Sequence, residues 1–387
     1  MSQRRANGHG LTFTAIQVEN WRNFSSARAD LVQRVFLVGP NASGKSNFLD
    51  VFRFLHDVVA VGGGLEEACR RRQGISKVRA LTARRFPHVR IVVTLAGTNG
   101  DRWTYDLALG GKKRPEVASE TVELNGKKLL ERPNDADRDD PERLTQTYLQ
   151  QVNVNKEFRP VVETFASVRY LHIVPQLIRD PDRSVGRVDD PFGGDLLEQI
   201  ARTNERTLKS RLSKISDALK VAVPQLSELE LWRDARGAPH LRGRYEHWRP
   251  QGAWQTEDQF SDGTLRLLGL LWAMVDDGGL LLLEEPELSL HPDVVRHLPA
   301  MFARMQRQSG RQIITSTHSL DLLRDEGIGL DEVLLLTPGD EGTTVRSAST
   351  IEDAAALLDG GSTLAEVIMP LTRPANSEQL MFSFGGH

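Results

Sequence analysis

The chain has 387 residues, of which 39% are hydrophobic and 26% charged, enough for a large buried core. A formal net charge of −3 excludes a polycation that coats nucleic acid indiscriminately, so any DNA contact must come from local basic patches. The longest apolar runs are shorter than the roughly 20 residues that cross a bilayer, and the N-terminus lacks the apolar core of a secretory signal. With one cysteine, we expect a cytoplasmic protein without disulfides or membrane contact.

A glycine-rich loop follows the first predicted strands. Residues 11–31 alternate apolar and polar side chains, and the next run, "RVFLVG", is typical of a buried strand. The loop "GPNASGKS" then has Gly39, four residues, and Gly44-Lys45-Ser46 before a predicted helix. In such a loop the backbone N–H groups bind phosphate, Lys45 neutralises the β and γ oxygens, and the Ser46 hydroxyl coordinates Mg²⁺. The loop therefore predicts a nucleotide-phosphate site.

The next two segments are basic and then strand-rich. Residues 62–90 contain the densest positive patch, and its candidates for DNA contact are Arg70, Arg71, Arg72, Lys77 and Arg79, with Arg84 and Arg85 in the same patch. Strand-like segments joined by turn sequences then predict an antiparallel β-lobe that ends near residue 130. An acidic linker and a mostly helical segment follow, with one core strand near 168–174.

In the last third of the chain, two apolar strands are each followed by polar residues: the first by a pair of acids and the second by a histidine. Helices and strands alternate there, which predicts a mostly parallel sheet covered by helices. "GLLLLEEPELSLHP" brings two acids to the carboxyl edge of that sheet, where ligands of such folds bind. Glu284 is placed to hold Mg²⁺ directly or through water, and Glu285 to orient an attacking water. His318 follows the next strand and can reach a γ-phosphate from the same edge.

The segment "QFSDGTLRLL" has two interpretations. Ser-Asp-Gly-Thr is an ordinary helix N-cap, in which Ser261 or Asp262 accepts hydrogen bonds from first-turn amides. A serine, a glycine and free amides at a helix N-terminus also form an anion site. These residues alone leave both interpretations open.

Together and in this order, these segments resemble the ATP-binding head of the ABC superfamily, in its RecF/SMC/OLD-type branch of predicted AAA-family ATPases. "GPNASGKSN" resembles the Walker A motif, "LLLLEEPELSLHP" the Walker B motif and D-loop, "FSDGTLR" the signature motif and "STHS" the His-switch. The resemblance implies an α/β P-loop NTPase of ABC-ATPase type. Its mostly parallel core sheet is flanked by helices and carries an antiparallel β-lobe and a helical insertion. The implied parts are the first part of the core at 1–60, the basic segment and β-lobe at 61–130, the linker and insertion at 131–255, and the second part of the core at 256–387.

The resemblance also implies roles for individual residues. ATP would be bound by Gly39, Asn41, Ser43, Gly44, Lys45, Ser46 and Asn47, and by Arg22 of "ENWRNF", which resembles the N-terminal motif of the branch. Ser261 and Gly263 would contact the γ-phosphate held by a second subunit, in trans. The resemblance implies a catalytic role for Glu285, His318 and Lys45. It implies metal contacts for Ser46 and Glu284, and also for Gln176, which is the candidate for the Q-loop glutamine that senses Mg²⁺ and water in this superfamily.

The signature motif departs from the usual pattern. It has Ser-Asp-Gly-Thr rather than Ser-Gly-Gly-Gln, so Asp262 places a negative charge near the expected phosphate. If the Asp262 side chain turns outward as a helix cap, it costs phosphate binding little. If it turns toward the phosphate, it weakens the binding of that phosphate in trans. The Walker B acid on the magnesium side is Glu284, where most ABC proteins have aspartate.

The expected function is an ATP-dependent dimeric switch that uses ATP and Mg²⁺ and acts on DNA or on a partner effector, in DNA repair or antiphage defence. The distance in sequence from Lys45 to Ser261 fits a compact head without coiled-coil arms. About fifty residues follow "VLLLTPG", too few for a TOPRIM nuclease domain, so we expect any nuclease or effector to be a separate chain. Two alternatives are a P-loop small-molecule kinase and a transporter-type ATPase subunit.

Overall fold

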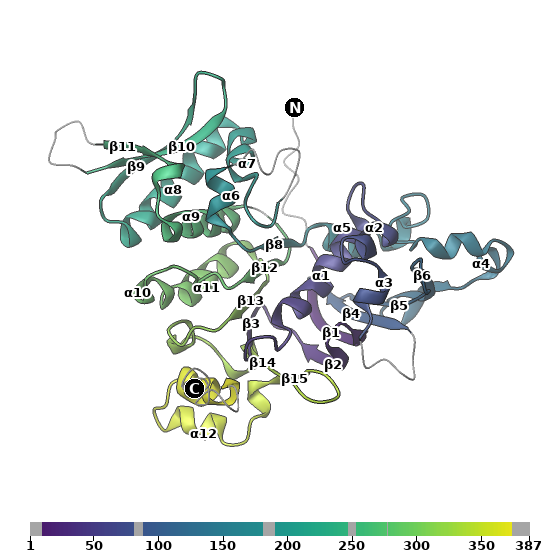
Figure 1. The fold of residues 1–387 in the computed structure, drawn as a ribbon. Helices are drawn as coiled ribbons and strands as arrows, with labels where there is room; N and C mark the ends of the chain where they lie inside the picture. Colours follow the sequence, from purple (N-terminus) through teal and green to yellow (C-terminus); the bar gives the residue numbers. More distant parts are fainter. Residues whose placement is uncertain (1–9, 81–87, 181–189, 247–252, 277, 374–387) are drawn as a thin grey trace, which may run out of the picture.

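Three sheets organise the computed structural model, which describes residues 10–80, 88–180, 190–246, 253–276 and 278–373 (Figure 1). The core sheet has the strand order β15-β14-β3-β13-β12-β8, and only β15 is antiparallel to its neighbour. Its strands are β3 (Arg34–Val38), β8 (Arg169–Leu171), β12 (Leu281–Glu284), β13 (Ile313–Thr317), β14 (Val333–Thr337) and β15 (Thr344–Ser347). This is the α/β architecture that the sequence predicts, built from strands at both ends of the chain together with β8 from its middle.

The core strands are continuous apolar runs because both faces of the sheet are covered. In β3, Val35 and Leu37 face a cluster that includes side chains of α1 (Lys45–Val59), and Phe36 faces a cluster that includes side chains of α9 (Asp262–Val275). Successive residues of a strand point to opposite faces. Helices α1 and α9 therefore cover opposite faces of the core sheet.

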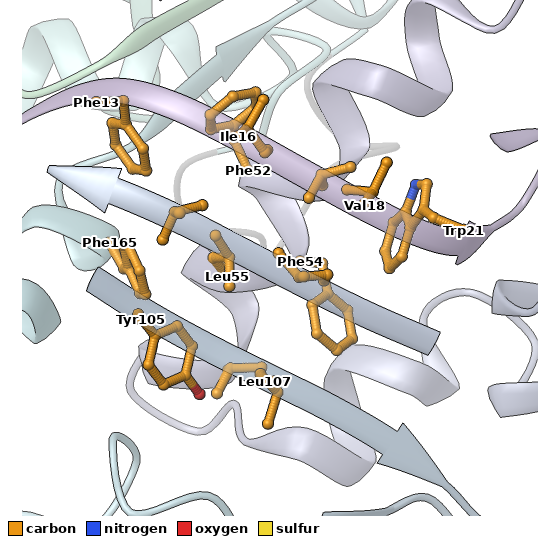
Figure 2. Close-up of a cluster of buried hydrophobic side chains, with 14 of the residues drawn as sticks. Phe13, Ile16, Val18, Trp21, Phe52, Phe54, Leu55, Tyr105, Leu107 and Phe165 are labelled. Atoms are coloured by element: carbon orange, nitrogen blue, oxygen red, sulfur yellow. The ribbon is translucent and has the colours of Figure 1, made fainter. Parts of the chain in front are cut away.

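The predicted β-lobe is a six-stranded antiparallel sheet of order β2-β1-β4-β5-β6-β7. Its strands are β1 (Thr12–Trp21), β2 (Phe24–Asp30), β4 (Val89–Ala96), β5 (Arg102–Gly110), β6 (Glu116–Leu124) and β7 (Lys127–Arg132). Figure 2 shows how the lobe packs on α1: the rings of Phe13 and Phe52 lie 5.2 Å apart, and those of Trp21 and Phe54 5.4 Å apart, both edge to face. The lobe and the phosphate-loop helix thus share one buried core.

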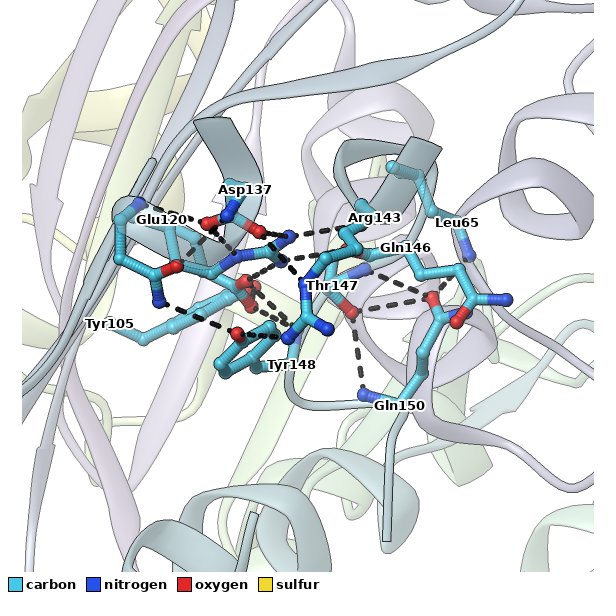
Figure 3. A network of polar contacts seen from close by, with 11 residues as sticks. Leu65, Tyr105, Glu120, Asp137, Arg143, Gln146, Thr147, Tyr148 and Gln150 are labelled. Atoms are coloured by element: carbon cyan, nitrogen blue, oxygen red, sulfur yellow. Dashed lines mark hydrogen bonds and ion pairs between the residues drawn. The ribbon is translucent and has the colours of Figure 1, made fainter. Parts of the chain in front are cut away.

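A buried ion network closes the far end of the β-lobe (Figure 3). The side chain of Arg132, at the end of β7, has no exposed surface and pairs with Glu120 at 3.0 Å and with Asp137 at 2.8 Å. Arg132 also donates to the backbone oxygens of Arg143 and Gln146. Because every charge in the network is paired, the chain after β7 is held against the sheet.

The middle of the chain differs from the helical insertion that the sequence predicts, since it also contains a three-stranded antiparallel sheet, β11-β10-β9. Its strands are β9 (Leu226–Arg233), β10 (Pro239–Tyr245) and β11 (Ala253–Thr256). Leu229 and Leu241 are buried on one face, while Trp232 and Trp254 are more than a third exposed on the other. Such short, half-polar strands give a weak sequence signal. The core strand predicted over 168–174 is also shorter, because β8 spans Arg169–Leu171.

The remaining α-helices surround the sheets. They are α2 (Leu65–Arg70), α3 (Ile75–Val78), α4 (Asp135–Asp139), α5 (Arg159–Ala166), α6 (Pro175–Arg179), α7 (Leu196–Arg202), α8 (Glu205–Ala222), α10 (Pro292–Val295), α11 (Leu298–Ser309), α12 (Ala354–Asp359) and α13 (Leu364–Ile368). Across the described ranges, no helix combines the length and apolar character needed to span a membrane.

Candidate functional site

Three parallel strands of the core sheet end at one edge, and each is followed by predicted site residues. β13 lies between β3 and β12, with Thr317 opposite Val38 and Ser316 opposite Glu284. The phosphate loop, the Walker B acids and His318 therefore begin at neighbouring positions on this edge. The structure brings these three predicted segments together, as the parallel register requires.

Glycines shape the phosphate loop where side chains have no room. Gly44 has φ of 97° and directly precedes α1, and a Cβ there would lie 2.1 Å from the Asn23 side chain. A Cβ at Gly39 would lie 2.5 Å from the backbone oxygen of Leu336. Asn23 donates to the Ser43 backbone oxygen at 3.2 Å and accepts from Asn47 Nδ2 at 2.7 Å. Asn23 thus supports the loop, a role that sequence reasoning did not identify.

Lys45 is the first residue of α1 and is 5% exposed. Its Nζ donates to the backbone oxygens of Gly39 and Pro40, both at 3.0 Å. Burial lowers the pKa of Lys45 from 10.5 to about 8, although the nearby carboxylates of Glu285, Glu284 and Glu287 oppose the shift. These three carboxylates are acids of the Walker B segment. In the described part of the chain, the hydrogen bonds of this buried ammonium go to two carbonyl oxygens, which suits it to receive phosphate oxygens.

Ser46 and Glu284 form the candidate metal site. Ser46 Oγ donates to Glu284 Oε1 at 2.5 Å, which joins the start of α1 to the end of β12. The other carboxylate oxygen accepts from the hydroxyl of Tyr170, and His172 Nδ1 lies 3.2 Å from the Glu284 backbone oxygen. Burial and the Glu284 charge raise the pKa of Tyr170. Tyr170 and His172 come from β8 and the residue after it, and no sequence motif pointed to them.

Glu285 pairs with His318 across the same edge. His318 Nε2 lies 3.4 Å from Glu285 Oε1, and both side chains are about one-third exposed. The hydrogen bond from His318 lowers the pKa of Glu285, against the burial that would raise it. Glu285 has φ of 45°, an unusual conformation for a residue other than glycine, and such residues cluster at functional sites. This carboxylate is charged, partly exposed and held in place, so it can accept a hydrogen bond from a water molecule at this edge of the sheet.

Glu287 holds the turn that carries His318. Its Oε1 accepts from Thr317 Oγ1 at 2.5 Å and from the His318 backbone N–H at 3.1 Å. Its Oε2 is buried and has no hydrogen-bond partner within the described part of the chain, and burial raises the pKa of Glu287. Sequence reasoning used this acid only as part of the motif, whereas the geometry gives it a supporting position behind the Glu285–His318 pair.

The donor set fits ATP with Mg²⁺. Mg²⁺ in nucleotide sites is held by one or two protein oxygens together with substrate phosphates and water. Ser46 and Glu284 supply such oxygens, and the described residues hold no cluster of three or more acids, histidines or cysteines that would form an all-protein metal cage. Ser43 Oγ is buried without a hydrogen-bond partner among the described residues, which leaves one more polar atom in the loop open to a ligand.

The signature segment lies at the N-terminus of α9. Ser261 is the N-cap, and its Oγ accepts from the Thr264 N–H at 3.1 Å, as the capping interpretation predicts. A Cβ at Gly263 would lie 2.5 Å from the Ser289 backbone oxygen, so α9 packs closely against the segment after the Walker B acids. Within the described ranges, no hydrogen bond joins Ser261 or Gly263 to the phosphate loop of the same chain.

Arg22 and Gln176 make no hydrogen bond or ion pair, within the described residues, with Ser46 or Glu284 of the candidate metal site. Arg22 Nη2 lies 2.7 Å from Asp50 Oδ2 on α1, one turn after Ser46. Gln176 is exposed on α6, and in the described structure no contact joins it to Ser46 or Glu284. Its proposed role at the metal therefore rests on the resemblance alone. Among the Walker A residues, Asn41 is exposed and Asn47 is tied to Asn23.

The basic segment is largely neutralised by acids of the same chain. Arg72 is 7% exposed and pairs with Asp50 and Asp57, both at 2.8 Å, so it lies in a buried ion network and not on the exposed patch that the predicted DNA contact assumes. Arg71 pairs with Asp57 and Glu67. Arg70 pairs with Glu67 but is exposed, and Lys77 is exposed as well. Arg79 donates to the Gly111 backbone oxygen. Arg84 and Arg85 lie outside the described residues. Clustered arginines in the sequence here tie α2 to α1.

Residues 34–325 match the family described as "AAA domain, putative AbiEii toxin, Type IV TA system". Among curated proteins, none matches the chain in sequence. An SMC head bound to the C-terminal winged-helix domain of ScpA is similar in structure, with a TM-score of 0.55 and 13% identity over 90% of this chain and 99% of that chain.

Two further solved structures have the same fold. The Smc head with an extended coiled coil, bound to the C-terminal domain of ScpA, from Pyrococcus furiosus has a TM-score of 0.53 and 12% identity over 90% of this chain and 99% of that chain. The Smc head with a coiled coil and joint from Pyrococcus yayanosii has a TM-score of 0.52 and 10% identity over 91% of this chain and 99% of that chain. At these identities the likeness establishes the fold of the head.

Proposed function

The chain belongs to this AAA-domain family, as an ABC-superfamily ATPase of SMC/RecF-like type, and on that premise we propose that it hydrolyses ATP as a two-copy switch. ATP would close two copies head to head, and hydrolysis would release them. The cycle would act on DNA or on a separate effector chain. In two of the similar structures the head is bound to a domain of a separate ScpA chain, which supports a separate partner here.

The observation that carries this proposal is the pairing of Glu285 with His318 beside the Ser46–Glu284 contact, on one edge of the core sheet. Lys45 would neutralise the phosphate oxygens, and Glu285 would accept a proton from the attacking water while His318 holds its carboxylate in place. Mg²⁺, when bound through Ser46 and Glu284, would supply positive charge to the same phosphate oxygens. This arrangement of positioned charges is what phosphoryl transfer to water requires.

The position of the signature segment supports a second copy in the site. Helix α9 covers the face of the core sheet opposite to α1, so Ser261 and Lys45 stand at the start of helices on opposite faces of that sheet. We propose that Ser261 and the Gly263 amide complete the site of the other copy. We also propose that residues 1–60 and 256–387 contribute to one ATPase core together with β8 from the segment 131–255. β1 and β2 of the first part belong to the β-lobe, where they lie in one sheet with the strands that begin within 61–130.

Mixing two inactive variants tests the shared site. Lys45→Ala removes the phosphate contact, and Ser261→Arg blocks the signature, so each variant alone should lack ATPase activity. A mixed pair has one complete site, and equal mixing should restore about a quarter of the wild-type rate, since half of random pairs are mixed and each has one of two sites. Failure of every mixture to regain activity, with both variants folded, would contradict a site built from two copies.

A further inference from the structure

Arg179 contacts the signature segment on both sides of Ser261. On α6, its Nη2 donates to the Phe260 backbone oxygen at 2.6 Å and lies 2.7 Å from Asp262 Oδ1. Phe260 is 2% exposed, so its backbone is fixed by burial, whereas the Asp262 side chain is 42% exposed. One guanidinium thus bridges the residue before Ser261 and the residue after it.

Asp262 is the acid that departs from the usual signature. It occupies the first turn of a 14-residue helix, where a carboxylate is favoured by the helix N-terminus. In the proposed closed pair, this turn would face the phosphates held by the second copy. An unpaired carboxylate there would repel the phosphates and cancel the attraction of the helix N-terminus.

We propose that Arg179 is a positioning residue that neutralises Asp262 and fixes the Ser261 turn, so that the signature accepts the phosphate of a second copy. This inference rests on the proposed function. Arg266, one helical turn after Asp262, also interacts electrostatically with Asp262, but it lines a small cavity with Glu284 and Glu285. Arg179 is the cation that makes the ion pair.

The position of Arg179 in the chain links the two halves of the site. Tyr170 and His172 contact Glu284, and the same short segment continues through Pro175 into α6 and reaches Arg179. A change around Glu284 is therefore connected to the signature through fewer than ten residues of backbone. This gives the nucleotide site of one copy a direct structural connection to the surface it offers to the other.

The test asks whether removing the Asp262 charge reverses the defect caused by Arg179→Ala. Both substitutions are made in the Glu285→Gln protein, which should bind ATP without hydrolysing it. Light scattering gives the ATP concentration at half-dimerisation, and a fluorescent ATP analogue gives the affinity of the monomer. Arg179→Ala should raise the half-dimerisation concentration at least about tenfold while monomer affinity stays unchanged. Adding Asp262→Asn should restore dimerisation to within about threefold, because the repelling charge is gone.

Salt gives a second readout that a purely structural role would not move. Repulsion by an unpaired Asp262 is screened, so the defect of Arg179→Ala should shrink as ionic strength rises from about 0.05 M to about 0.5 M. Arg202→Ala is the matched control, because it breaks an exposed 2.7 Å pair with Glu198 away from the signature and should change nothing. Arg179→Lys should fall between wild type and Arg179→Ala.

The outcomes separate this inference from the proposed function. A parent Glu285→Gln protein that stays monomeric with ATP bound overturns the proposed function and this inference with it. The role of Arg179 alone is overturned if the Glu285→Gln protein dimerises and Arg179→Ala leaves its dimerisation unchanged. It is also overturned if Asp262→Asn does not restore the dimerisation that Arg179→Ala has weakened. Rescue by Asp262→Asn excludes misfolding as the cause of the defect.

Discussion

Three glutamates within four residues of the Walker B segment have three different surroundings. Glu284 is held by Ser46 and Tyr170, and Glu285 faces His318. Glu287 accepts hydrogen bonds from Thr317 and His318 and has one buried carboxylate oxygen. The residue type is the same, but the pKa is lowered at Glu285 by His318 and raised at Glu287 by burial. In the proposed function, these surroundings would assign metal binding to Glu284, base catalysis to Glu285 and a supporting position to Glu287.

The first prediction concerns Glu287. Glu287→Ala removes the acceptor of the Thr317 hydroxyl and the His318 N–H, so kcat for ATP hydrolysis should fall about tenfold or more while ATP affinity is retained. Glu287→Gln keeps an accepting oxygen and the shape of the side chain, and should retain most of the activity. Steady-state ATPase assays and nucleotide titration measure both quantities. Equal losses in the two variants would show that the charge, and not the accepting oxygen, is what matters.

The second prediction is a pH dependence of ATP affinity. The pKa of Lys45 is lowered to about 8 in the free protein, and bound phosphate raises it, so binding takes up a proton above that pH. Affinity should be flat below about pH 8 and fall up to about tenfold per pH unit above it. Lys45→Arg stays protonated, and its remaining affinity should not show this fall. Calorimetric titration between pH 7 and about 9.5 measures the slope, and a flat wild-type profile would contradict the prediction.

At the scale of elements, α1 is the part that joins the nucleotide site to the rest of the fold. Its first residue is Lys45, its middle carries Asp50 and Asp57, and its apolar face packs on the β-lobe. Arg72, from the end of α2, binds both acids from a buried position, and Arg22 binds Asp50 from the turn between β1 and β2. The basic segment therefore braces the helix that carries the phosphate loop.

The third prediction follows from this brace. Arg72→Ala leaves two mostly buried carboxylates with fewer partners and should lower the free energy of unfolding by about 3 kcal/mol. Arg70→Ala, which removes a side chain that is 75% exposed, should change it by less than about 0.5 kcal/mol. Urea unfolding followed by circular dichroism compares the two. Similar small effects at both positions would mean that the Arg72 network adds no stability.

Sequence patterns predicted the elements whose signal is local, and missed those that depend on distant neighbours. The loop around Lys45, the acids after β12 and the histidine after β13 follow continuous apolar strands, so their placement at one sheet edge could be foreseen. Tyr170, His172 and Arg179 have no motif, because their partners lie about 80 to 115 residues away. The same holds for Arg72, where charge alone could not distinguish a buried brace from an exposed patch.

At the scale of the whole molecule, the two halves of the proposed site lie on opposite faces of the core sheet. Helix α1 and the phosphate loop belong to the β-lobe side, and α9 with the signature belongs to the side of the inserted segment (Figure 1). Gly263 is packed so closely against the Ser289 backbone that an added Cβ would lie 2.5 Å from its oxygen. Joining the phosphate loop to the signature within one chain would require a large rearrangement. Two copies arranged head to head would join them without one.

The mass of the Glu285→Gln protein with and without ATP tests this account most directly. Light scattering at saturating ATP and Mg²⁺ should show the 43.2 kDa monomer doubling in mass, and the doubling should disappear when Lys45→Ala is added. ADP should leave the protein monomeric. A Glu285→Gln protein that binds ATP with full occupancy, measured in the same sample, and still has the monomer mass would contradict the two-copy switch.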